Sequence, residues 1–265
     1  MNIKKILSII CCFISSQVFP QNIDSTHYEV DQKEDTLVLK RWKGNEGYID
    51  MSCDSVLKNI KIIGKKAFEY NKTLKEIKLP DGIVKIDVAA FNNCLTLKSI
   101  VLPNSLISIE SSGFNMCENL RSIQLPDGLI SIGDWAFWKC KRMSISNLPL
   151  GLKYIGEHAF SLCENIESIK IPSLILSIKK KTFSLCKKLN RVVLPDNLRR
   201  IEEGSFAGCE NLCEIKFPRS LEFIGYHSFL GCDRLTLVSL SSHTSMEECF
   251  SKNTNVVRID TLIDN

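Results

Sequence analysis

Proline recurs every 23 residues along most of this chain of 265 residues. The members of the series are Pro80, Pro103, Pro126, Pro149, Pro172, Pro195 and Pro218, and only Pro20 stands outside it. A fixed period of about 20–50 residues is typical of repeat proteins, in which each unit buries its apolar edge only against the next unit. The spacing therefore predicts one elongated stack of coils rather than two compact domains.

Three further residue types follow the same period. Phenylalanine occurs at Phe68, Phe91, Phe114, Phe137, Phe160, Phe183, Phe206 and Phe229. Cysteine occurs at Cys94, Cys117, Cys140, Cys163, Cys186, Cys209 and Cys232. Isoleucine occurs at Ile63, Ile86, Ile109, Ile132, Ile155, Ile178, Ile201 and Ile224. The unit reads L-x-x-I-x-L-P-x-x-L-x-x-I-x-x-x-(small)-F-x-x-C-x-x, which is the leucine-rich-repeat signature.

The unit predicts an α/β solenoid, with a parallel β-sheet on one face and short helical turns on the other. The I-x-L piece alternates inward and outward, and proline then ends the strand because it has no N–H to donate. We expect one strand per repeat in a single curved sheet, centred near Ile77, Ile100, Ile123, Ser146, Ile169, Val192, Ile215 and Val238. The fourth coil is the weakest, because Ser146 takes the inward position and Ile145 the outward one.

The ends of the chain depart from the period. Residues 1–20 combine Lys4 and Lys5, an apolar run over 6–14 and the small residues Ser15 and Ser16. This order predicts a secretory signal peptide, while the cysteines at 11 and 12 leave a lipid-modified cysteine open. We expect an N-terminal cap with a degenerate first repeat over 21–62, the solenoid over 63–240 and a C-terminal cap over 241–265.

The regular cysteines invite disulfide or metal interpretations. No Cys-x-x-Cys pair occurs, and beyond residues 1–20 the nearest pair, Cys209 and Cys213, is four residues apart. Cysteines on successive coils run in a line, whereas a tetrahedral metal site needs converging ligands and a disulfide needs side chains aimed at each other. We therefore expect reduced, buried thiols that pack as small hydrophobic groups. No metal or cofactor is expected.

Composition and motifs argue against catalysis and nucleic-acid binding. The chain is 44% hydrophobic and 24% charged, with a net charge of +4, which is too weak a bias to imply a nucleic-acid partner. Sequence motifs of hydrolases, metalloproteases and nucleotide-binding enzymes are missing. Two of the four histidines, His158 and His227, share a repeat position three coils apart. We expect no catalytic residues.

The segment 178–200 is the most strongly basic stretch of the sequence, with eight Lys and Arg residues against one Asp. Its cations include Lys179, Lys180, Lys181, Lys187, Lys188, Arg199 and Arg200. They suggest an anion-binding surface for glycosaminoglycan or lipopolysaccharide. In a solenoid, however, each residue lies beside those 23 positions away. Expected partners are therefore Glu157 or Glu203 for Lys180, Glu164 or Glu210 for Lys187, Glu202 for Lys179, Glu214 for Arg191 and Glu222 for Arg199.

Two surfaces remain as candidate binding sites. Trp135 and Trp138 flank Phe137, point outward by their phase, and would share one face of a helical turn, with His158 one coil beyond Trp135. Exposed aromatic pairs are typical binding anchors, although both rings could equally lie flat over neighbouring coils. The runner-up is the strand face, whose candidates are Glu76, Lys78, Gln124, Asn147, Lys170, Arg191 and Lys216.

With these residues in view, the chain resembles the BspA-like leucine-rich-repeat surface proteins of bacteria, first noted in treponemes. The resemblance covers about residues 51–240 and rests on the coincident proline, phenylalanine and cysteine registers. It implies a secreted or cell-surface protein that binds or adheres to host or neighbouring-cell macromolecules, and it supplies no catalytic residues. The expected partner is an extracellular protein or glycan, and no transmembrane segment is expected. The alternative is a structural spacer of the cell envelope that binds nothing.

Overall fold

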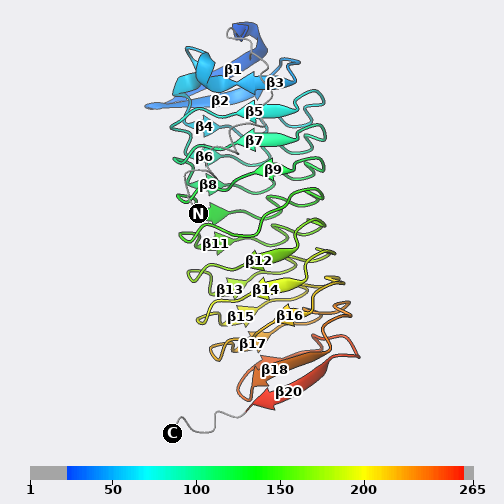
Figure 1. The fold of residues 1–265 in the computed structure, drawn as a ribbon. Helices are drawn as coiled ribbons and strands as arrows, with labels where there is room; N and C mark the ends of the chain where they lie inside the picture. The colour runs from blue at the N-terminus through cyan, green and yellow to red at the C-terminus, as the bar shows by residue number, and fades with distance from the viewer. Residues whose placement is uncertain (1–22, 260–265) are drawn as a thin grey trace, which may run out of the picture.

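The computed structural model describes residues 23–259 and has the predicted architecture, a stack of 23-residue coils (Figure 1). Neighbouring coils pair in the register that the period requires, so that Ile77 pairs with Ile100 and Ile100 with Ile123. The predicted leucine-rich-repeat solenoid is confirmed. Coils are numbered below by their proline, from Pro80 in coil one to Pro218 in coil seven.

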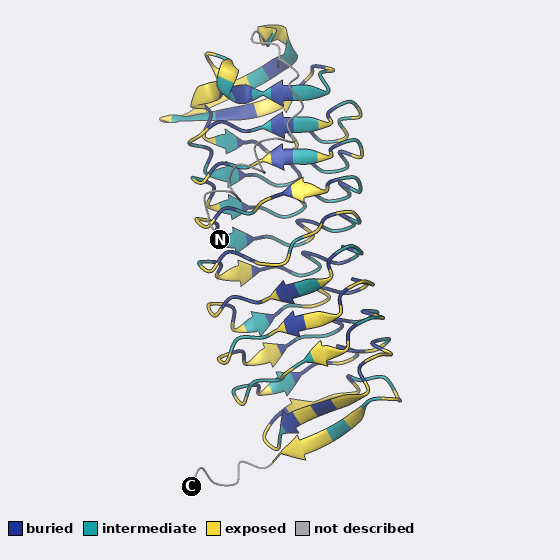
Figure 2. Ribbon diagram, in the orientation of Figure 1, coloured by how far each residue is buried: buried dark blue, intermediate teal, exposed yellow. Residues whose placement is uncertain are grey.

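The strand face is built from the I-x-L segments. Its strands are β3 (Tyr48–Asp50), β5 (Glu76–Lys78), β7 (Ser99–Val101), β9 (Ser122–Ile123), β12 (Ser168–Lys170), β14 (Arg191–Val193), β16 (Glu214–Ile215), β18 (Leu237–Ser241) and β20 (Asn255–Ile259). In β5 and β7 the central isoleucine is buried and its neighbours are not (Figure 2). The alternation read from the sequence therefore places isoleucine in the core and leaves the flanking side chains outward.

Each coil also contributes to a second ladder, which corrects the expectation of one strand per repeat. Its strands are β4 (Ile62–Ile63), β6 (Lys85–Ile86), β8 (Ser108–Ile109), β10 (Ser131–Ile132), β11 (Tyr154–Ile155), β13 (Ser177–Ile178), β15 (Arg200–Ile201), β17 (Phe223–Ile224) and β19 (Ser245–Met246). These strands contain the second isoleucine register, which is buried. Two residues are too short a run for an alternating pattern to be recognised in the sequence.

The expectation of one continuous sheet is wrong. The strand face divides into three hydrogen-bonded groups, β3-β5-β7-β9, β12-β14-β16 and β18-β20, so no group holds more than three of the eight predicted strand centres. The first break falls at coil four, where Ser146 is exposed and outside any strand. Serine gives this segment no apolar side chain to bury, so the core does not hold it in the ladder.

The predicted helical turns are also absent, because the described residues contain no α-helix. Each coil instead makes consecutive tight turns, such as those closed by Ala67 N–H to Gly64 C=O at 3.1 Å and Glu69 N–H to Lys66 C=O at 3.1 Å. Two residues per coil take left-handed φ angles, 62° at Lys66 and 59° at Tyr70 in the first case. The N–H of Lys66 thereby donates to Val88 C=O of the next coil at 3.1 Å. Bonding between coils therefore selects turns rather than helix.

A column of aromatic rings runs through the core. It links Tyr28 and Trp42 to the eight repeat phenylalanines and then to Phe250, eleven stacked rings in all. Successive repeat phenylalanines lie 4.8–5.6 Å apart between ring centroids. That spacing is close to the distance between paired strands, about 4.8 Å. One phenylalanine per coil therefore continues the column without a gap.

The ladder cysteines are buried and free, as expected. Each thiol also has a polar partner that the sequence did not reveal, the carbonyl of the phenylalanine one coil earlier. Cys94 Sγ donates to Phe68 C=O at 3.0 Å, and Cys186 Sγ to Phe160 C=O at 3.2 Å. Serine or alanine side chains would fill the same position less completely, so cysteine meets both an apolar and a hydrogen-bonding need.

The two ends of the stack differ from its middle. At the N-terminal end, η2 (Ser25–His27) leads into an antiparallel hairpin of β1 (Tyr28–Lys33) and β2 (Thr36–Trp42), and β2 pairs with β4. The short helices η3 (Met51–Cys53) and η4 (Leu57–Asn59) precede the first regular coil. The predicted boundaries at 62 and 240 stay predictions. The predicted signal peptide over 1–20 lies outside the described residues.

Candidate binding surface

The strand face is hollowed along its length. A hollow of about 670 Å³ lies over β7 and β9 and is lined by residues from Glu76 to Pro126. A second hollow, of about 500 Å³, lies over coil four and is lined by residues from Ile123 to Pro172. Gln124 lines both, and a third hollow of about 280 Å³ follows over β14 and β16. Together they make the strand face a surface that can receive a ligand.

The predicted strand-face residues are not equally free to bind. Lys78 Nζ lies 3.1 Å from Asp50 Oδ2 and donates to Ser52, so this lysine fastens β3 to β5. Arg191 pairs with Glu214 at 3.2 Å across β14 and β16. The remaining members, apart from half-buried Glu76, are exposed and line the hollows: Gln124, Asn147, Lys170 and Lys216.

Coil four contributes an apolar side chain that sequence reasoning missed. Leu150 is 74% exposed, the largest value for a large hydrophobic residue among the described residues, and it lines the second hollow. The equivalent position holds Asp127 one coil earlier and Ser173 one coil later. Comparing positions 23 residues apart for polar-to-apolar exchanges would have found it. Leu150 adds apolar surface to the rim of this hollow.

The aromatic candidates lie on the lateral turns. Trp135 is 41% exposed and stacks on His158, with 5.3 Å between ring centroids, so the predicted stacking across coils is present. Burial lowers the pKa of His158, and the nearby Lys181 lowers it further. Trp138 is half-buried, with the Lys139 ammonium 4.4 Å from its ring centroid. Because these turns are not helical, the argument that Trp135 and Trp138 share one helical face no longer holds.

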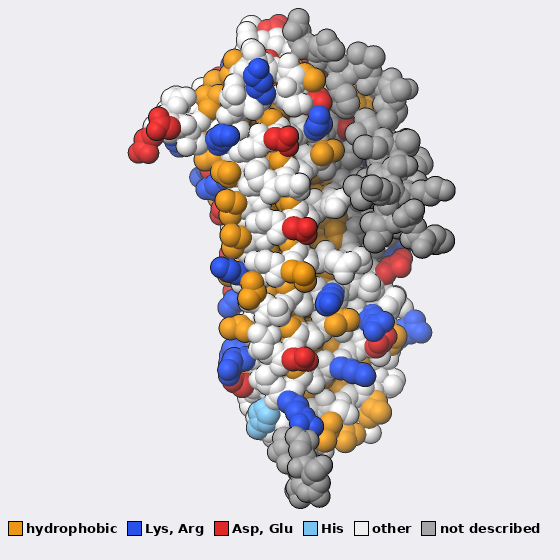
Figure 3. All heavy atoms as spheres, turned by 60° about the vertical axis from the view of Figure 1, so that its left-hand side comes forward, with side chains coloured by type: hydrophobic (Ala, Val, Ile, Leu, Met, Phe, Trp, Pro, Cys, Tyr) orange, Lys and Arg blue, Asp and Glu red, His pale blue; other side chains and the backbone are white. Residues whose placement is uncertain are grey.

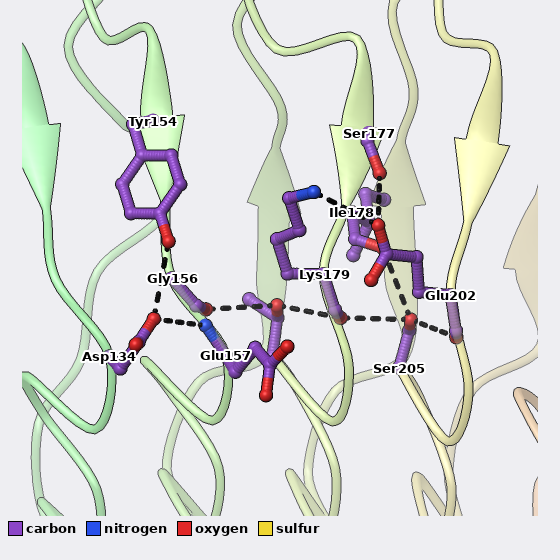
Figure 4. Close-up of polar contacts among 10 residues, drawn as sticks. Asp134, Tyr154, Gly156, Glu157, Ser177, Ile178, Lys179, Glu202 and Ser205 are labelled. Carbon is purple, nitrogen blue, oxygen red and sulfur yellow. Dashed lines mark hydrogen bonds and ion pairs between the residues drawn. The ribbon is translucent and has the colours of Figure 1, made fainter.

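Polar side chains join coils next to this aromatic pair (Figure 4). Asp134 Oδ1 accepts hydrogen bonds from the Tyr154 hydroxyl at 3.3 Å and the Glu157 N–H at 2.9 Å. Glu202 Oε1 accepts from the Ser177 hydroxyl and the Lys179 ammonium, both at 3.0 Å. These carboxylates are engaged in holding neighbouring coils together, which is a structural role.

The basic segment forms the expected ladder of opposite charges. Ion pairs connect Lys179 to Glu202 at 3.0 Å, Lys180 to Glu203 at 3.3 Å and Lys187 to Glu210 at 3.2 Å. Arg199 pairs with Glu222. Three further candidate cations have other surroundings. Lys188 donates to Asn165 at 2.7 Å, Arg200 lies over the Phe223 ring, and Lys181 lies near His158.

The part of the chain that the structure describes is residues 23–259. Within them, no group of three or more His, Cys, Asp and Glu side chains could hold a metal ion. No helix in the same range is long and apolar enough to cross a membrane.

Comparison with known proteins agrees with this architecture. The family model for the BspA type leucine rich repeat region matches residues 61–190 and 176–262, in six copies. The chain belongs to this family. Proteins of the BspA-type family and of this fold are typically non-enzymatic, and leucine-rich-repeat proteins generally bind proteins. No curated protein matches the chain.

Solved structures of bacterial leucine-rich-repeat proteins are similar to this BspA-type chain. The leucine-rich-repeat protein of T. pallidum is 26% identical, with 72% of this chain and 90% of that chain covered and a TM-score of 0.67. A leucine rich cell surface protein from Faecalibacterium prausnitzii is 20% identical, with 93% and 96% covered and a TM-score of 0.42.

Proposed function

We propose that this BspA-type protein is exported through its N-terminal segment to the cell surface or the extracellular medium. There it binds an extracellular protein or glycan without catalysing a reaction. Family membership supports export and adhesion, and residues 1–20 have the order of a secretory signal. The strand face is the primary contact surface, and the lateral face around Trp135 and His158 is the second candidate.

The three hollows are the reason for placing the ligand on the strand face. A macromolecular ligand needs contact over many residues, and concave surfaces bury more of a ligand than flat ones. The strand-face hollows follow one another over seven coils, from β5 to β16. Figure 3 turns the left-hand side of Figure 1, which holds β4, β6 and β8, toward the viewer. On this face the hydrophobic side chains are spread among charged and uncharged ones. The row of three hollows is therefore the feature that favours binding over a spacer role.

One observation supports the lateral face around Trp135 and His158 as a binding site. Trp135 is exposed and held against His158 by stacking, so the ring loses little conformational freedom when a ligand covers it. Aromatic side chains held in this way often dominate interfaces.

The proposal is tested by placing an arginine inside or outside the hollows. Val101→Arg fills the first hollow. Ile107→Arg is the control, because Ile107 is an apolar residue of nearly the same exposure that lies just before β8 and lines none of the three hollows. The purified protein and both variants are measured against immobilised extracellular-matrix proteins and glycans. Val101→Arg should weaken binding at least tenfold and Ile107→Arg should not.

Trp135→Ala in the same assay distinguishes the two candidate faces. A loss of binding with Trp135→Ala, but not with Val101→Arg, would move the site to the lateral face. Absence of binding to every matrix protein and glycan would favour the spacer role.

A further inference from the structure

The strand face ends in an open edge on its C-terminal side. β20 pairs in parallel with β18, and within residues 23–259 no strand pairs with its other side (Figure 1). All its residues except half-buried Val256 are exposed (Figure 2). In the described part of the chain, no further coil is stacked on the outer side of β20. This edge is therefore accessible to another strand.

The bonds to β18 show which way the peptide groups of β20 point. Asn255, the first residue of β20, donates its N–H to Thr236 C=O at 2.8 Å. Ile259, the last residue, accepts at its C=O from Ser242 N–H at 3.2 Å. Both ends of β20 therefore bond toward β18.

The middle of β20 presents unpaired backbone at the outer edge. The bonding direction alternates along a strand, so Val257 bonds toward β18 like the two end residues. Val256 and Arg258 then direct their N–H and C=O groups away from β18. Among the described residues, none bonds to these groups. Two residues that each offer a donor and an acceptor thus lie on the edge, with one residue between them.

The N-terminal edge of the stack is protected against pairing, whereas the C-terminal edge is not. The N-terminal edge strand, β1, carries Glu29, Asp31 and Lys33 and a shift of register after Glu29. Charges and bulges of this kind keep edge strands from joining other chains. β20 reads Asn-Val-Val-Arg-Ile and pairs without a shift. Its one charged side chain, that of Arg258, donates to two carbonyls of its own chain, at 3.0 and 2.6 Å.

We propose that two copies of this protein associate through their β20 strands, which pair antiparallel about a two-fold axis at Val257. In this register Val256 of each copy lies opposite Arg258 of the other, and each such pair exchanges both backbone bonds. The groups that one edge leaves unpaired are therefore the groups that the second edge requires. Val257 faces its own equivalent, and the two arginines are not directly opposite each other.

The arrangement favours a second copy as the occupant, because the edge is complementary to itself and two-fold pairs are the commonest homo-oligomers. The pair is one stack of double length, with both strand faces on the same side. Two short strands form a small interface compared with the about 1,200–2,000 Å² of a standard one, so we expect a reversible dimer. β20 lines none of the three hollows, so this association is independent of the proposed ligand binding.

The two-fold axis supplies a decisive pair of variants. Val257→Lys and Val257→Glu each place two like charges opposite one another in the dimer. Ser239→Lys is the matched control, because Ser239 is the partner of Val257 on β18 and lies one strand away from the edge. Dimer formation by the purified protein and the variants is measured by sedimentation velocity over about 1–500 µM, the range of a weak interface.

The wild type and Ser239→Lys should pass from monomer to dimer with rising concentration. Val257→Lys and Val257→Glu should each dimerise at least about fivefold more weakly. An equimolar mixture of these two should regain the dimer, because lysine then faces glutamate. In the wild type, rising concentration should slow amide hydrogen exchange, measured by NMR, at Val256 and Arg258.

Three results would overturn the proposal. They are a wild type that stays monomeric at the highest concentration, a dimer that Val257→Lys leaves unchanged, and a mixture of the lysine and glutamate variants that dimerises no better than either alone. None of them affects the matrix-binding assay with Val101→Arg.

Discussion

Replacing one ladder cysteine should change how stability depends on pH. Burial raises the pKa of the Cys186 thiol to about 12, whereas an unfolded cysteine has a pKa of about 8.5. At a pH between these two pKa values, the Cys186 thiol is deprotonated in the unfolded chain and still protonated in the folded chain. The free energy of unfolding therefore falls with rising pH, by about 1.4 kcal/mol per pH unit for this group. Its contribution is fully present below about pH 8.5 and is lost as the pH rises toward 12.

The magnitude follows for Cys186→Ala. At pH 8 the variant should be less stable by about 1–3 kcal/mol, because it loses the packing of a fully buried sulfur and the bond to Phe160 C=O. pH 10 is about 1.5 units above the unfolded pKa. At this pH the titration of Cys186 should have lowered the free energy of unfolding of the wild type by about 2 kcal/mol, and the variant, which lacks this thiol, should not show that loss. The difference between the two proteins should therefore shrink by about 2 kcal/mol.

Urea denaturation at pH 8, 9 and 10, under reducing conditions, measures this difference. Cys213→Ala removes an exposed thiol and controls for the loss of a sulfur as such. A stability difference between wild type and Cys186→Ala that stays constant from pH 8 to 10 would refute the reasoning. An equal alkaline effect in Cys213→Ala would refute it as well.

Two further predictions concern the core and the turns. Phe137→Ala removes a fully buried ring stacked at 5.3 and 5.4 Å on its neighbours and should cost about 3–5 kcal/mol of unfolding free energy in urea; a loss below about 1 kcal/mol would contradict the role of the column. Trp135→Gly should be more stable than Trp135→Ala by about 0.5–1 kcal/mol in thermal unfolding. The φ of 53° strains any residue with a Cβ by about 1–2 kcal/mol, which exceeds the extra unfolded-state entropy of glycine. Equal stabilities would argue against the left-handed turn.

The 23-residue period alone determined which residues are neighbours on successive coils. Once each residue is placed next to those 23 positions away, the stacked phenylalanines, the buried cysteines and ion pairs such as Lys179 with Glu202 follow without knowledge of the coil's shape. These contacts depend on which residues are neighbours, and the register supplies that directly. The same logic identified coil four as the weak point from Ser146.

The tertiary structure decided the shape of the backbone between those contacts. The segments that were predicted to be helical turns are tight turns with left-handed residues such as Lys66 and Trp135. This geometry lets alternate backbone N–H groups donate to the next coil. It also decided that Ser146 leaves the strand ladder instead of being held in it by its neighbours, and a hollow lies over coil four at this point. A repeat pattern specifies the burial of each side chain, whereas the balance between hydrogen bonds within a coil and between coils is settled only when the coils are stacked.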